Sequence, residues 1–240
     1  MSIIFAVFER GFFQMKKSSA WVMTQTWEHL MFMHWEQTPD KIKALIPSEL
    51  ELDLYNGKAW ITILPFKVTH QKFHWLPEIP LLNTYLELNV RTYVKFKGKA
   101  GVYFFKLDAN HPLTVLGTKA MSLPYRLSKM EMVEENNEIL FKSRRLFEYG
   151  EFSARYESAS QPKQLEPGSL DYWLLERYCL FTKWGNLLLR GDIRHEKWEV
   201  SEVNYRIMEN EVAPFPLTTD PLLLHYAAKK QVIIFPLRKA

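Results

Sequence analysis

Cysteine is nearly absent from this 240-residue sequence, which contains only one. A single cysteine cannot form an internal disulfide bond, so a disulfide-stabilised secreted scaffold is excluded and a reducing cytoplasm is the predicted compartment. Zinc ribbons and iron–sulfur clusters need several cysteine ligands and are excluded as well. We therefore predict neither a bound metal nor a cofactor.

Long hydrophobic runs and dense charge are also missing. No stretch approaches the roughly 20 apolar residues of a membrane-spanning helix. The 31 basic and 27 acidic residues give a net charge of only +4 and are interspersed, apart from the short run 142–145. Neither a membrane span nor nucleic-acid binding is predicted. Residues 3–8 are apolar but lack a basic start, so residues 1–20 are expected to form a poorly ordered or edge-docked extension instead of a signal peptide.

Aromatic residues are abundant, with 16 Phe, 11 Tyr and 8 Trp, and hydrophobic residues make up 47% of the chain. This composition provides for a sizeable core and excludes disorder over most of the chain. The length corresponds to about one and a half typical domains, and no segment separates two self-sufficient halves. We predict one domain over residues 21–240.

Alternating and aromatic segments predict a mainly β domain. Asn56–Gly57 stands between two such segments and predicts a hairpin turn, because this dipeptide adopts positive φ at low cost. A second hairpin is predicted around Gly98, between residues 86–94 and 101–107. Further strands are predicted at residues 138–147, 152–157, 187–195 and 232–235.

A few short helices accompany the strands. Thr38–Pro39 supplies a capping hydroxyl and a proline at the first helical position, so a helix is predicted up to about residue 45. Ser169 caps a predicted helix over residues 170–181, in which Cys179 is a buried apolar position, and Asp220–Pro221 starts a third helix. Residues 158–168 are a predicted surface loop or linker. Together these elements predict an antiparallel, barrel-like α+β domain.

Residues 86–94 predict a strand with one polar side. Alternate side chains of a strand share a face, so Glu87, Asn89, Arg91 and Tyr93 lie together, opposite an apolar face. Residues two apart lie about 7 Å from one another, which allows the first three to surround one small ligand. Two interpretations stay open: a solvated outer face, or an inward face on which the Glu and the Arg need each other or a ligand, because unpaired buried charge is costly.

Other motifs carry little chemistry. His70 and His74 are four residues apart but lack a carboxylate at a metalloprotease spacing, so no metal site is predicted. His34, His195 and His225 are isolated beside aromatic residues, which is typical of packed histidines. The sequence has neither a Gly-x-Ser-x-Gly nucleophile elbow nor a glycine-rich phosphate loop.

One set of short motifs is shared with a known family. The set comprises Trp27–Leu30, Met33–Trp35, Gly57–Trp60, Pro65–Phe66, Glu87–Tyr93, Gly101–Phe105, Leu107–Ala109 and Leu123–Tyr125. On these motifs the chain, from about Trp21 to its end, resembles the YqjF-like family of uncharacterised bacterial proteins, which is grouped with the acetoacetate decarboxylase superfamily. The resemblance implies a conical antiparallel β-barrel with a few short peripheral helices and an internal pocket.

The resemblance also implies a role for particular residues. Glu87 looks like the pocket glutamate of the decarboxylases, whose Schiff-base lysine and neighbouring lysine follow a proline. Here Pro124 is followed by Tyr125 and Arg126. Tyrosine forms no imine and arginine stays protonated, so the decarboxylase mechanism is not expected. The hydroxyl and the cation are instead candidates for holding a small carboxylate or carbonyl compound.

Three functions stay open at this stage. The favoured one is a cytoplasmic protein, without required catalysis, whose pocket binds a small anionic or carbonyl-bearing metabolite through Glu87, Asn89, Arg91, Tyr93, Tyr125 and Arg126. The second is a lyase or hydrolase acting on a small oxo acid, with Glu87 as acid or base and a displaced lysine, Lys106 or Lys119, as covalent partner. The third is a structural or partner-binding β-protein. A homo-oligomer is predicted, because related decarboxylases assemble.

Overall fold

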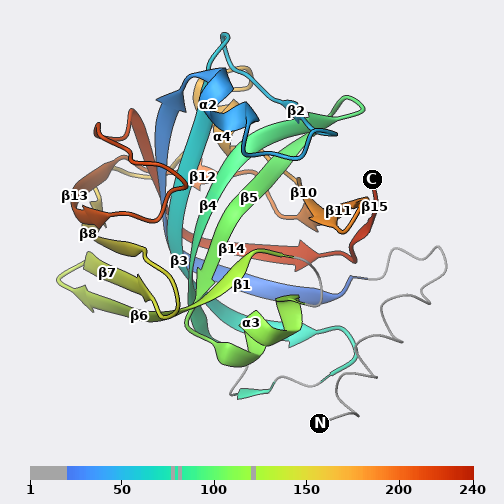
Figure 1. The fold of residues 1–240 in the computed structure, drawn as a ribbon. Helices are drawn as coiled ribbons and strands as arrows, with labels where there is room; N and C mark the ends of the chain where they lie inside the picture. Colours follow the sequence, from blue (N-terminus) through green and yellow to red (C-terminus); the bar gives the residue numbers. More distant parts are fainter. Residues whose placement is uncertain (1–20, 77–78, 81–82, 120–122) are drawn as a thin grey trace.

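The computed structural model describes residues 21–76, 79–80, 83–119 and 123–240. Strands dominate this part of the chain, with only three short helices among the described residues (Figure 1). The prediction of a mainly β, α+β protein is confirmed. The predicted extension over residues 1–20 lies outside the described residues.

The helices are α2 (Pro39–Lys43), α3 (Pro112–Lys119) and α4 (Leu170–Leu175). The strands are β1 (Met23–Gln37), β2 (Glu51–Leu52), β3 (Ala59–Phe73), β4 (Tyr85–Phe96), β5 (Lys99–Ala109), β6 (Tyr125–Glu135), β7 (Glu138–Arg145), β8 (Glu151–Ser158), β9 (Lys163–Gln164), β10 (Cys179–Trp184), β11 (Leu187–Arg194), β12 (Glu199–Val200), β13 (Val203–Asn210), β14 (Leu223–Ile234) and β15 (Arg238–Lys239).

Seven strands are linked by a circuit of pairings that returns to its start. Going round, β5 pairs with β10, β10 with β11, β11 with β14, β14 with β1, β1 with β3, β3 with β4, and β4 again with β5. Strands β6, β7, β8 and β13 pair antiparallel with one another and extend from β5 as an arm. The predicted antiparallel arrangement is wrong at β5, which pairs parallel with both β6 and β10. This arm lies at the side of the longer strands in Figure 1.

Strand β4 separates two apolar cores. Leu88 and Val90 belong to a first core that also contains residues of β7 and β8. Tyr85 and Tyr93, on the opposite face of β4, belong to a second core with residues of β1, β3 and β5. Residues of α4 and Trp198 complete this second core. The face of β4 that carries its polar residues is therefore covered by protein.

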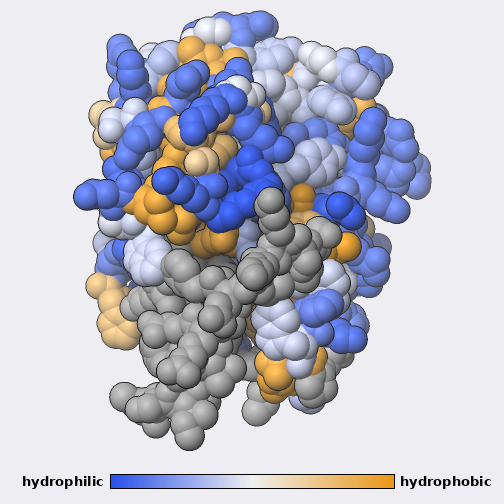
Figure 2. Space-filling view, turned by 90° about the vertical axis from the view of Figure 1, so that its right-hand side faces the viewer, coloured by the Kyte–Doolittle hydropathy of each residue, from blue (hydrophilic) through white to orange (hydrophobic). Residues whose placement is uncertain are grey.

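The surface is mixed in character. On the face shown in Figure 2, hydrophilic residues surround smaller hydrophobic areas. Among the described residues, no helix has the length and apolar character needed to cross a membrane.

Several predicted elements are confirmed. Strands β4 and β5 form the second predicted hairpin, with Lys97 (φ 48°) and Gly98 (φ 77°) in a two-residue turn. Strands β7, β8 and β11 match their predicted ranges to within two residues. Ser169 caps α4, since its side chain accepts a hydrogen bond from the Tyr172 amide. Helix α2 begins at Pro39 as predicted, but it ends at Lys43 and the Thr38 side chain makes no capping bond.

The predicted helix over residues 170–181 is wrong beyond Leu175. Arg177 Nε donates to the Trp173 carbonyl at 2.7 Å, and its Nη1 donates to buried Asp53 at 2.7 Å. These contacts hold the chain in an extended path after α4. Cys179 therefore begins strand β10, although it is buried as predicted.

Three other predictions need correction. Asn56–Gly57 forms the predicted two-residue turn, with φ of 49° and 76° and an antiparallel bridge between Tyr55 and Lys58, but the pairing goes no further, because β2 pairs with β4 and not with β3. No helix follows Asp220–Pro221, because the Leu222 amide donates to the His34 carbonyl at 2.8 Å and leads directly into β14. The predicted strand at 232–235 is the end of that longer strand. Strand β6 was missed, since its charged residues obscure the alternation.

Gly101 allows β5 and β10 to approach closely, so we expect the Gly101→Ala substitution to destabilise the fold. A Cβ there would lie 2.8 Å from the Cys179 carbonyl oxygen, and overpacking of this kind costs about 2 kcal/mol of unfolding free energy. In Gly191→Ala the nearest atom belongs to the flexible Leu237 side chain, so the expected loss is smaller. Urea denaturation measures both, and an equal loss in the two variants would contradict this account.

Candidate functional site

The polar side of β4 is buried. Glu87, Asn89 and Tyr93 are 6%, 4% and 0% exposed. In register with Glu87 and Asn89 stand apolar residues of the neighbouring strands, namely Phe66 and Leu64 of β3 and Ala109 and Leu107 of β5. Of the two interpretations that the sequence left open, the solvated outer face is therefore wrong.

Glu87 and Tyr125 are hydrogen-bonded to each other. The Tyr125 hydroxyl donates to Glu87 Oε2 at 2.9 Å. Burial raises the pKa of Glu87 to about 8, the bond from Tyr125 opposes this rise, and the charge of Asp108 adds to it. Burial and the neighbouring Glu87 charge also raise the pKa of Tyr125 well above its usual value. The carboxyl group of Glu87 is therefore mostly protonated at neutral pH, a state in which it can donate to a carbonyl oxygen.

Arg91 lies partly buried on the same face as Glu87 and is hydrogen-bonded to Tyr93, but it has no anionic partner among the described residues. Its Nε has no hydrogen-bond acceptor, and the Oδ1 of neighbouring Asn89 has no donor. The guanidinium lies 5.7 Å from the centroid of the Phe32 ring, and the Trp198 ring, whose buried Nε1 is also unpaired, lies 5.1 Å from that same ring. Burial lowers the pKa of Arg91 from its usual value. Two unsatisfied donors beside one aromatic ring are a suitable environment for an anionic group.

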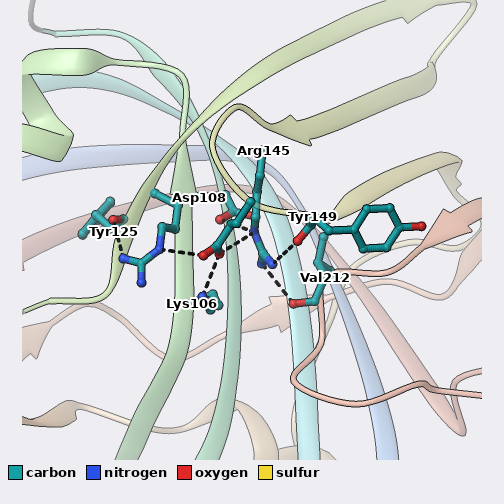
Figure 3. Close-up of polar contacts among 8 residues, drawn as sticks. Lys106, Asp108, Tyr125, Arg145, Tyr149 and Val212 are labelled. Carbon is teal, nitrogen blue, oxygen red and sulfur yellow. Dashed lines mark hydrogen bonds and ion pairs between the residues drawn. The ribbon is translucent and has the colours of Figure 1, made fainter.

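The side chain of Arg126 points to the opposite side of β6 from the side chain of Tyr125, because side chains of successive strand residues alternate. Its Nε pairs with Glu148 at 3.2 Å, and the same carboxylate pairs with Lys106 at 2.7 Å (Figure 3). Lys106 stands in register with Val90, whose side chain belongs to the first core, so its ammonium group lies on the face of β4 and β5 opposite Glu87. The structure therefore separates both cations from the buried polar side of β4. The side chain of Lys119 lies outside the described residues.

A pocket of about 440 Å³ opens beside α3. Tyr125 and Arg126 both line it, together with Pro112, Val115, Leu116, Leu127, Arg145, Phe147 and Glu148. Because the Tyr125 hydroxyl also contacts Glu87, this one side chain connects the pocket wall to the buried face of β4.

Asp108 and Arg145 form a buried ion pair that no sequence pattern predicts. Arg145 Nε donates to both carboxylate oxygens at 2.9 and 3.0 Å, and its Nη2 donates to the Val212 carbonyl at 3.0 Å (Figure 3). Burial raises the pKa of Asp108, while the bond and charge of Arg145 oppose the rise. The two residues come from β5 and β7, so no local pattern joins them.

Solved structures share the fold over most of the chain. One is the acetoacetate decarboxylase of Legionella pneumophila subsp. pneumophila str. Philadelphia 1, with a TM-score of 0.65, 13% identity, and coverage of 95% of this chain and 93% of the other. Another is an acetoacetate decarboxylase-like enzyme of Sphingomonas wittichii RW1, with a TM-score of 0.64, 12% identity, and coverage of 92% and 93%. The enduracididine biosynthesis enzyme MppR complexed with pyruvate is a third, with a TM-score of 0.65, 10% identity, and coverage of 94% and 93%. At these identities the likeness defines a protein of acetoacetate decarboxylase-like fold.

The sequence then identifies the family. The chain belongs to DUF2071, described as "Uncharacterized conserved protein", whose model matches residues 24–231. The uncharacterized protein YqjF of Bacillus subtilis (strain 168) is 43% identical over 236 residues, which cover 95% of this chain and 98% of YqjF. The resemblance to YqjF-like proteins is thus confirmed.

We expect Arg145→Leu to reduce the free energy of unfolding by about 3 to 5 kcal/mol, because it leaves the Asp108 carboxylate buried and unpaired. A matched control is Arg155→Leu, which breaks the half-exposed pair with Glu138 and is expected to cost less than about 1 kcal/mol. Urea denaturation measures both variants. Similar losses in the two would contradict a structural role for the buried pair.

Glu87 is expected to make stability depend on pH. Its pKa is about 8 in the folded protein against an ordinary 4.5, so the folded state binds more protons in this window and stability falls as pH rises through it. Glu87→Gln keeps an acceptor for Tyr125 but has no group that ionises at this position, so its stability does not fall in this pH window. The variant therefore gains stability relative to wild type between pH 5 and 8, by up to about 5 kcal/mol at about 1.4 kcal/mol per pKa unit.

Chemical denaturation at a series of pH values measures this gain. Glu131→Gln is the control, since Glu131 on β6 is exposed and pairs with Lys142. The plot of its unfolding free energy against pH is expected to run parallel to that of wild type. A parallel curve for Glu87→Gln as well would show that Glu87 ionises normally and would contradict the prediction.

Proposed function

We propose that this protein binds a small carboxylate that carries a carbonyl group, on the buried polar side of β4. The observation that carries the proposal is the Nε of Arg91, which is shielded from water and has no acceptor, on a guanidinium with no anionic partner among the described residues. Such a cation is costly until an anion joins it. Asn89 and Trp198 supply further unpaired polar atoms nearby. Protonated Glu87 is the donor for the carbonyl oxygen of the ligand.

The proposed ligand class agrees with what the fold accommodates elsewhere. MppR, which shares the fold, is described in complex with pyruvate. We infer that the circuit of seven strands encloses a conical barrel and that its interior is the binding chamber, with Tyr93 and Tyr125 as further contacts. Arg126 is left out of this chamber, because it pairs with Glu148 on the opposite face.

A lyase or hydrolase with a covalent lysine is the second candidate, and the raised pKa of Glu87 favours it, since a protonated carboxyl group is a general acid. Lys106 does not share a face with Glu87, so Lys119 is the remaining lysine for this version. Reduction with borohydride in the presence of pyruvate or acetoacetate traps an imine as a stable amine. An unchanged protein mass after this treatment would exclude the covalent version.

Three broader properties stay predictions. A reducing cytoplasm agrees with the one cysteine, Cys179, being free and buried. Assembly into oligomers agrees with exposed apolar side chains on α3 and after β7, namely Leu113, Leu116, Leu146 and Phe147. One domain over residues 21–240 remains the proposed organisation.

We expect Arg91→Gln to weaken binding of pyruvate at least about 10-fold, because a hydrogen bond to a charged group contributes about 1.5 to 3 kcal/mol. Arg126→Gln is the matched control and is expected to change the dissociation constant less than about 2-fold, since this exposed arginine pairs outside the site. Isothermal titration calorimetry measures both, with circular dichroism as a check on folding. Equal effects, or a larger effect at Arg126, would move the site to the pocket beside α3.

A further inference from the structure

Two buried histidines connect the surface to the interior near Arg91. His34 of β1 and His225 of β14 face each other, with His34 Nε2 and His225 Nδ1 3.3 Å apart. His225 Nε2 lies 3.1 Å from a carboxylate oxygen of Asp171 on α4. The side chain of Asp171 is 42% exposed, whereas His34 is fully buried. The histidines that the sequence indicated as packed residues therefore belong to a polar chain.

The chain continues inward through two hydroxyl groups. His34 Nδ1 lies 2.9 Å from the Thr62 hydroxyl, and that hydroxyl lies 2.6 Å from the hydroxyl of Tyr93. Tyr93 is two residues from Arg91 on the same face of β4, and its side chain is hydrogen-bonded to the guanidinium. We call Tyr93, Thr62, His34, His225 and Asp171 the relay.

Only one direction of donation satisfies every contact of the relay when both imidazoles are neutral. A carboxylate only accepts, so His225 Nε2–H donates to Asp171 and its Nδ1 must accept from His34 Nε2–H. His34 Nδ1 then accepts from Thr62, whose oxygen accepts from the Tyr93 hydroxyl. Burial, His225 and Arg91 together lower the pKa of His34 well below its usual value, which keeps His34 neutral.

Charged groups surround both ends of the relay. Arg91 lies near its inner end, and the guanidinium of Arg177 lies 5.1 Å from the Tyr93 ring centroid. His195 is close enough to Arg91 for the charge of Arg91 to lower the pKa of His195. At the outer end, the bond from His225 and, more weakly, the charge of Lys163 lower the pKa of Asp171. The inner end is thus positive and the outer end holds a carboxylate, which favours proton movement outward.

We propose that the relay performs acid–base catalysis: the Tyr93 hydroxyl removes a proton from, and returns it to, the carbon next to the carbonyl of a small carboxylate bound at Arg91. This inference rests on the proposed function, because it needs the ligand there. Tyr93 is the catalytic residue. The other four members of the relay position it and carry its proton.

The proton count balances without a cofactor. A C–H bond of the ligand breaks, and its proton joins the Tyr93 oxygen as the hydroxyl proton moves to Thr62. The Thr62 proton moves to His34 Nδ1, the Nε2 proton of His34 moves to His225, and the Nε2 proton of His225 moves to Asp171. The electron pair stays on the ligand as an enolate facing Arg91. The same steps in reverse restore the ligand.

Exchange of the methyl protons of pyruvate in D2O, followed by proton NMR, tests the relay. We expect wild-type protein to exchange them faster than buffer alone. Tyr93→Phe is expected to lose about 100-fold in rate and Asp171→Asn about 10-fold, magnitudes typical of general acid–base catalysis, while pyruvate still binds by calorimetry. Asp40→Asn, an exposed carboxylate in the first turn of α2, and the exposed Tyr205→Phe on β13 are the matched controls with unchanged rates.

The outcomes separate the two proposals. Binding of pyruvate without exchange above buffer overturns the relay and leaves the proposed function standing. Exchange that persists in Tyr93→Phe, or exchange accompanied by a borohydride-trapped adduct, also overturns the relay. If pyruvate does not bind, the proposed function is contradicted and the catalytic role of Tyr93 with pyruvate falls with it. Nitrogen NMR of the free protein then tests the direction of donation along the relay. The expected result is His34 protonated at Nε2 and not at Nδ1, and the opposite tautomer overturns it.

Discussion

The burial of ionisable groups along one side of β4 is the constraint on which the rest of the structure depends. A charged side chain moved from water into an apolar interior is costly unless it is paired, neutralised or bound to a ligand. Glu87 meets this constraint by holding its proton and accepting a bond from Tyr125. Arg91 keeps its charge, bonds to Tyr93 and has no anionic partner among the described residues, and its Nε has no acceptor. This difference between the two residues defines the proposed site.

The surrounding fold makes that burial possible. The pairing of β4 with both β3 and β5 places apolar residues on either side of Glu87 and Asn89. Helix α4 and Trp198 close the same face and contribute to the second core. The buried Asp108 and Asp53 each form an ion pair with an arginine of the protein, Arg145 and Arg177 respectively. Arg91 differs from Arg145 and Arg177 in having no carboxylate partner among the described residues.

Sequence patterns predicted what is local and missed what is distant. Alternation in residues 86–94 gave the strand and the grouping of its polar residues, because strand periodicity is a property of the backbone. The end of α4 was missed because the Arg177 contacts with Trp173 and Asp53 involve the tertiary structure. The histidine chain joins β1, β14 and α4, and no spacing within the sequence indicates that His34 and His225 meet. Tyr125 and Arg126 were predicted to share one ligand because they are adjacent in the sequence. Their side chains point to opposite sides of β6.

A crystal structure of the protein grown with pyruvate shows whether the buried side of β4 binds this ligand. We expect the pyruvate carboxylate within hydrogen-bond distance of Arg91 Nε, and its carbonyl oxygen beside Glu87. Density for pyruvate only in the pocket beside α3, against Arg126, would contradict the account. Pyruvate absent from both places, with hydrocarbon side chains filling the space beside Arg91, would contradict it equally.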